Sequence, residues 1–85
     1  MSTAILTDAR IVSVEVSDAA IIAHLADRRV VSVPLEWSWR LMKATPQQRA
    51  HWEIIGDGQG VHWPEVDEDI SLEGMLRGVP AKQPS

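Results

Sequence analysis

The sequence predicts an α+β domain: a three-stranded antiparallel β-meander, two short helices, a short hairpin and a C-terminal helix. Three observations predict it. Residues 9–35 are rich in β-branched residues with a period of two, which is typical of strands with one face inward. From residue 36, large apolar residues recur four apart, which is the spacing of a helix face. Near the C-terminus, a serine precedes an apolar run that ends in Arg-Gly, as in a capped helix.

The first third of the chain is predicted to form three strands, because short polar breaks separate its apolar runs. In the first run, three valines alternate with polar residues and are expected to face inward: Val12, Val14 and Val16. The second run covers residues 20–26 and is almost wholly apolar. The third run covers residues 29–35 and contains Pro34, which is tolerated only near a strand end or on an edge strand.

Two short helices are predicted next. Residues 36–43 read as one helix with a large apolar face. The second helix begins after Thr45, whose side chain is suited to cap the free backbone N–H groups. Pro46 suits the first helical position, and Gln48 is placed to reach back to Thr45 in a capping box.

A hairpin is predicted from residues 53–55 and 60–63, because a glycine-rich turn that can supply positive φ angles separates them. The last helix is predicted to begin after Ser71 as its N-cap, with Ile70 and Met75 as a hydrophobic staple. The acidic residues 67–69 are expected just before this helix, where negative charge interacts favourably with the helix dipole.

Length and composition set limits on the class of protein. The 85 residues predict one small domain over residues 1–79 and a flexible tail over residues 80–85. The absence of cysteine excludes disulfides and fits a reducing cytoplasm. No apolar run approaches the ~20 residues of a membrane helix, so no membrane association is expected. The net charge of −4 and the scattered basic residues argue against direct nucleic-acid binding.

The segment from residue 60 to residue 71 concentrates the side chains that could carry chemistry: one imidazole, one indole and four carboxylates. We name its carboxylates the acidic ridge: Glu65, Asp67, Glu68 and Asp69. Consecutive carboxylates point in different directions and lack the spacing of a calcium loop, so no metal site and no cofactor are expected. A Ser71–His62 catalytic pair is less favoured than Ser71 as a helix cap, because no strand-turn-helix elbow presents the serine.

Tryptophan is the only aromatic residue type in the chain, and four are present. Trp37 and Trp39 are two apart and so cannot both face inward on one helix. Exposed tryptophans are frequent interface residues. We therefore expect Trp39 or Trp63 on the surface, where either could contact a partner.

Three motifs occur in a familiar order: Thr-Pro-Gln-Gln-Arg at residues 45–49, His-Trp-Pro at 62–64 and Asp-Glu-Asp-Ile-Ser at 67–71. With them the chain resembles the domain of unknown function family 2442 over nearly its whole length. Two departures are visible. Trp39 stands where the family usually has proline, and Asp27-Arg28 replaces a usual Asp-Gly turn.

The resemblance implies a small bacterial or phage-borne α+β domain with no established catalysis. It also implies a protein partner encoded by a neighbouring gene, of family 4160, in a suspected toxin–antitoxin pair. We therefore expect a non-enzymatic protein-binding module with a regulatory or antitoxin-like role. Under this hypothesis the acidic ridge attracts the partner, apolar contact comes from Trp39, His62 and Trp63, and the acidic segment is oriented from within by Arg40 and Arg49.

Two other functions stay open from the sequence. One is a small metal-assisted enzyme that uses His62 and the adjacent carboxylates. The other is an acidic mimic of nucleic acid that inhibits a DNA-binding or CRISPR-type protein, which predicts a continuous negative face. The sequence sets neither the partner nor the oligomeric state, and a homo-oligomer is compatible with it.

Overall fold

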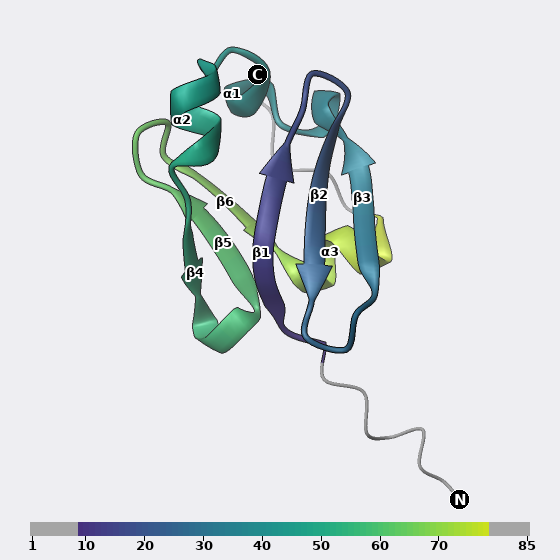
Figure 1. Ribbon diagram of the computed structural model, residues 1–85. Coiled ribbons are helices and arrows are strands. Elements are labelled where there is room, and N and C mark those ends of the chain that lie inside the picture. Colours follow the sequence, from purple (N-terminus) through teal and green to yellow (C-terminus); the bar gives the residue numbers. More distant parts are fainter. Residues whose placement is uncertain (1–8, 79–85) are drawn as a thin grey trace, which may run out of the picture.

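The computed structural model describes residues 9–78 and has the expected α+β class, with two three-stranded antiparallel sheets and three short α-helices (Figure 1). The tail expected over residues 80–85 lies outside the described residues. Figure 1 places the two sheets beside each other, with α1 and α2 at one end and α3 behind the first sheet. Within the described residues, no helix is long and apolar enough to cross a membrane.

The first sheet is the expected meander, in the order β1-β2-β3, formed by β1 (Ile11–Val16), β2 (Ala20–Leu25) and β3 (Val30–Pro34). β3 is an edge strand that ends at Pro34, so the missing N–H of proline costs no ladder bond. In the β2–β3 turn, Arg28 has a left-handed backbone with a φ of 74°, a conformation that glycine would adopt without strain.

The expectation that Val12 faces the core is wrong. The β1–β2 register shifts between Ile11 and Ser13, which is the mark of a β-bulge. The extra residue exchanges the faces, so Ile11 and Val14 are buried and Val12 is exposed. The alternation of valines alone could not reveal this shift.

The single helix expected over residues 36–43 is two pieces. A 3₁₀ turn, η2 (Leu35–Trp37), is followed by α1 (Trp39–Met42). Ser38 between them has an extended backbone, and its Oγ accepts a hydrogen bond from the Leu41 N–H, so it ends one piece and caps the next. Trp39 is then the first residue of α1, the position that favours proline.

The second helix, α2 (Pro46–Ala50), begins as expected. Thr45 Oγ1 accepts from the Gln48 N–H at 3.1 Å, and the Gln48 side chain accepts from the Thr45 N–H at 2.9 Å, which completes the capping box.

The second sheet has one more strand than the expected hairpin. β4 (Glu53–Ile55) and β5 (Gly60–Trp63) are joined through a 3₁₀ turn, η3 (Gly56–Gly58), and β6 (Glu68–Ser71) pairs with the other side of β5. Residues 67–69 were expected just before the last helix, as charges that stabilise its dipole. They lie instead in the β5–β6 turn and in β6 itself.

The last helix, α3 (Leu72–Arg77), has the expected ends. Ser71 Oγ accepts from the Gly74 N–H at 2.9 Å, and Gly78 takes the left-handed conformation at the C-cap. Met75 belongs to the buried core, and Ile70 packs against that core. The core unites both sheets, α1 and α3, through members that include Ile21, Leu41 and Trp63.

Candidate functional site

The outer face of the second sheet gathers carboxylates around one histidine. The register places Glu53 of β4 opposite His62 of β5, and His62 opposite Asp69 of β6, so the three side chains form a row across the sheet. Asp67 lies in the β5–β6 turn, two residues before Asp69. We name Glu53, His62, Asp67 and Asp69 the acidic face. Its two aspartate side chains are 89% and 66% exposed, in sequence order.

The carboxylates of this face act on the pKa of His62. His62 Nδ1 lies 2.5 Å from Asp69 Oδ1. This hydrogen bond raises the pKa of His62 above its ordinary value near 6.5, against a smaller opposing effect of desolvation, and the negative charges of Asp69, Glu53 and Asp67 raise it further. The imidazole is therefore held toward its cationic form by carboxylates from three segments.

Arg40 of α1 contacts the β5–β6 turn at Asp67. Its guanidinium donates to the backbone carbonyl of Asp67, and Nη1 lies 3.9 Å from the Asp67 carboxylate. The turn is strained here, because Asp67 has a φ of 55°, and the Arg40 contact holds that conformation from α1.

The expected role of Arg49 toward the acidic segment is wrong. Its Nη1 instead donates to Asp18 at 2.7 Å, in the β1–β2 turn. Nε donates to the Leu41 carbonyl and Nη2 to the Met42 carbonyl, so Arg49 ties the end of α1 to the meander.

Glu68 and Trp63 were expected on a partner-binding surface, and both are buried. Glu68 is 6% exposed, and its Oε2 accepts from Ser38 Oγ at 2.5 Å. Trp63 is fully buried and donates from Nε1 to the Arg49 carbonyl at 3.0 Å. The period of two explains the result, since Val61 and Trp63 share the core face of β5 while His62 faces outward.

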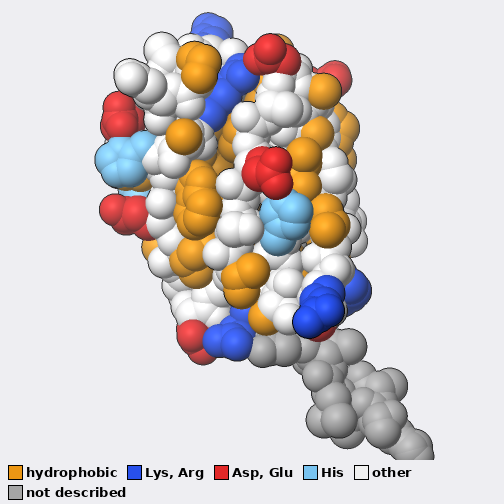
Figure 2. Space-filling model, in the orientation of Figure 1, with side chains coloured by type: hydrophobic (Ala, Val, Ile, Leu, Met, Phe, Trp, Pro, Cys, Tyr) orange, Lys and Arg blue, Asp and Glu red, His pale blue; other side chains and the backbone are white. Residues whose placement is uncertain are grey.

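The acidic ridge is therefore divided. Asp67 and Asp69 lie on the acidic face, Glu68 is in the interior, and Glu65 stays exposed but pairs with His51 at 2.5 Å. Figure 2 shows imidazoles beside carboxylates on the face that it presents. Trp39 is half-buried, with Arg40 and Lys43 over its ring at 5.3 and 5.5 Å. Its indole is thus partly occupied by the chain's own cations.

Two contributors escaped the sequence reading. Glu53 belongs to the acidic face. The spacing of the hairpin could have predicted this, because pairing Ile55 with Gly60 puts Glu53 opposite His62. An apolar hollow of about 220 Å³ lies beside Asp69, lined by Ile55, Gly60 and Ile70 among others. Gly60 leaves this space open, since a Cβ there would come within 3.3 Å of Ile55 Cγ1.

The donor set does not fit a metal centre. Across residues 9–78, no three His, Asp, Glu or Cys side chains are grouped so that they could hold a metal ion. The hydrogen-bonded carboxylate of His62 is Asp69 alone. The geometry gives no support to the metal-assisted alternative.

Comparison with known proteins identifies the family. Residues 11–81 match the model of the family described as Protein of unknown function (DUF2442), so the chain belongs to this family. No curated protein gives a significant match. The fold is shared with solved structures of uncharacterised bacterial proteins.

One such structure is the crystal structure of a protein of unknown function from Rhodospirillum rubrum, with a TM-score of 0.75 and 26% identity, over 91% of this chain and 95% of that one. Another is the solution structure of the uncharacterised protein CV0863 from Chromobacterium violaceum, with a TM-score of 0.72 and 29% identity, over 86% of this chain and 69% of that one.

Proposed function

We propose that this domain is a non-enzymatic protein-binding module, in a regulatory or antitoxin-like role, whose acidic face contacts a basic protein. The observation that carries the proposal is the convergence of Glu53, Asp67 and Asp69 on His62 from three separate segments. The exposed carboxylates of Asp67 and Asp69 would attract a basic partner, and the net charge of −4 would attract it as well.

The adjacent hollow supplies apolar contact that the carboxylates cannot. Ile55 is exposed beside Gly60 and lines the hollow next to Asp69. Interfaces combine an apolar centre with a polar rim, and this surface has both on one sheet face. Ile55 thus takes the part expected of Trp63.

The acidic mimic of nucleic acid is less well supported. A mimic needs a continuous negative surface, whereas His62 and Arg40 stand among the carboxylates here. Cations within the patch suit a partner with its own mixed charges better than a phosphate-binding groove.

The test is calorimetric titration with the purified product of the neighbouring gene, the partner that membership of the family suggests. The variant removes two charges, Asp67→Asn and Asp69→Asn, because asparagine tolerates the positive φ at residue 67. The matched control is Asp57→Asn with Glu73→Gln, which removes equal charge and includes a second positive-φ aspartate.

We expect the first variant to bind about tenfold more weakly, with a shallower salt dependence, at roughly 1.4 kcal/mol per tenfold change. The control should stay within about twofold. Equal affinity of both double variants and the unmodified chain would refute the acidic face as the contact surface.

A further inference from the structure

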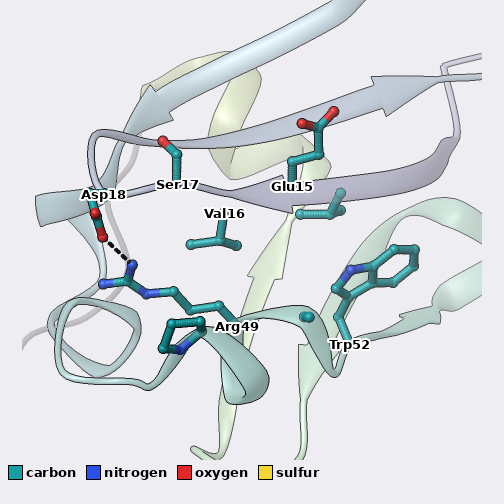
Figure 3. Close-up of a pocket in the computed structure, with 9 residues that line it drawn as sticks. Glu15, Val16, Ser17, Asp18, Arg49 and Trp52 are labelled. Carbon is teal, nitrogen blue, oxygen red and sulfur yellow. Dashed lines mark hydrogen bonds and ion pairs between the residues drawn. The ribbon is translucent and has the colours of Figure 1, made fainter.

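A hollow of about 530 Å³ runs along β1 on the side away from β2. Its lining comes from residues 14–18, from α2 and from Trp52, and includes no residue of β2. Figure 3 shows Trp52 at one end and the Arg49–Asp18 ion pair at the other, with Val16 between them. Glu15 and Ser17 project to the other side of β1.

The hydrogen-bond register tells which backbone groups of β1 point into this hollow. The Ser17 N–H donates to the Ala20 carbonyl, so this pair faces β2. Facing and outward residues alternate along an antiparallel pair, so Glu15 and Ser13 also bond to β2. The N–H and C=O groups of Val14 and Val16 therefore point away from the sheet. β1 is an edge strand, and within the described residues no strand pairs with it on that side.

An open strand edge that is hollowed and bounded by a helix is suited to accept a further strand. We propose that the β1 edge binds an extended, basic segment of a protein partner, which adds a strand through hydrogen bonds to Val14 and Val16. The β1 edge is a second contact surface, separate from the acidic face. The proposal of strand addition rests on the proposed function only for the basic character of the partner.

The charges at the ends of the hollow favour a cationic segment. The side chain of Asp18 is 99% exposed and gives only Oδ1 to Arg49, which leaves Oδ2 for an incoming ammonium or guanidinium. Arg49 is 11% exposed and uses Nε, Nη1 and Nη2 in bonds within the protein, so it offers little to an anion. Trp52 is half-buried and presents a flat ring, which packs well against aliphatic or cationic side chains.

The experiment is a nitrogen-15 NMR titration of the full chain with a capped peptide that alternates valine and lysine over five residues. The expected signature is an alternation: the amide protons of Val14 and Val16 shift downfield, whereas those of Ser13 and Glu15 change little because they already bond to β2. The indole N–H of Trp52 should shift with the same affinity.

Two comparisons test the hydrogen bonds and the charge. Val16→Pro removes one outward donor without removing a bond to β2, and should weaken binding about fivefold. Ser32→Pro, at an outward position of β3, is the matched control and should leave binding unchanged. The same peptide with glutamate for lysine should bind about two- to fivefold more weakly. Trp52→Leu provides a second test if Val16→Pro disturbs the spectrum of the free domain.

Several results would overturn the proposal. The absence of a saturable chemical-shift change at millimolar peptide would overturn it. Equal shifts of the amides of Ser13, Val14, Glu15 and Val16 would also overturn it. Shifts confined to His62 and Asp69 would place the peptide on the acidic face instead. Concentration-dependent sedimentation with the same β1 shifts in the absence of peptide would make a second copy of this chain the occupant. The NMR titration uses the peptide without the natural partner. A negative result in it would therefore not change the outcome of the calorimetric test of the acidic face.

Discussion

Replacement of Ser38 by alanine should destabilise the domain more than any other single hydroxyl deletion, because Ser38 Oγ has two buried partners. It caps α1 by accepting from the Leu41 N–H at 3.2 Å, and it donates to the Glu68 carboxylate at 2.5 Å. Loss of a helix cap costs about 1 kcal/mol. Loss of a hydrogen bond to a charged group costs about 1.5–3 kcal/mol. The two losses add to about 2.5–4 kcal/mol, and Glu68 keeps its bond from the Asp69 N–H.

Such a loss is a large part of the roughly 5–15 kcal/mol that stabilises a small domain. The assay is urea unfolding followed by tryptophan fluorescence, since Trp63 reports on the same core. Ser32→Ala, an exposed serine on β3, is the control and should change the free energy of unfolding by under about 0.5 kcal/mol. A double-mutant cycle with Glu68→Gln should show coupling of about 1–2 kcal/mol. A Ser38→Ala loss under about 1 kcal/mol, or no coupling, would refute the buried pair as a main link between α1 and β6.

Two further predictions concern a glycine and the histidine of the acidic face. Gly58→Ala should cost roughly 1–3 kcal/mol in thermal unfolding, because Gly58 has a φ of 89° and a Cβ there would lie 2.6 Å from Arg10 Cβ; an unchanged melting temperature would contradict this. The raised pKa of His62 contributes stability that is fully present below about pH 6.5 and is lost as the pH rises through the folded-state pKa. Asp69→Asn should lower the NMR titration midpoint of His62, and an unmoved midpoint would refute Asp69 as the main cause.

Local signals in the sequence predicted the elements whose stabilisation is local. The meander follows from alternating β-branched residues, and α2 follows from Thr45, Pro46 and Gln48, which contact one another within four residues. The ends of α3 are likewise set by Ser71 and Gly78.

The sequence reading missed features that depend on partners distant in the chain. β6 contains Asp69, which disfavours strands, and it forms because β5 offers Val61 and Trp63 as neighbours. The bulge at Val12 depends on the pairing of β1 with β2. The sequence predicted Glu68 to be a surface charge, because its hydroxyl partner, Ser38, lies 30 residues away in the chain. For the site, Asp67 and Asp69 lie on an exposed face and Arg40 contacts the Asp67 carbonyl, while their role toward a partner stays a prediction.

The buried pair and the acidic face are mechanically connected. Ser38 caps the helix that carries Arg40, and Arg40 holds the carbonyl of Asp67, while Ser38 also holds Glu68 directly after it. The inward carboxylate of β6 thus fixes the position of the two outward ones on either side. A variant at Ser38 should therefore weaken partner binding by displacing the acidic face, without removing any of its charge. This effect is distinguishable from direct loss of contact, because it should appear with an unchanged salt dependence, whereas the aspartate variants should reduce that dependence.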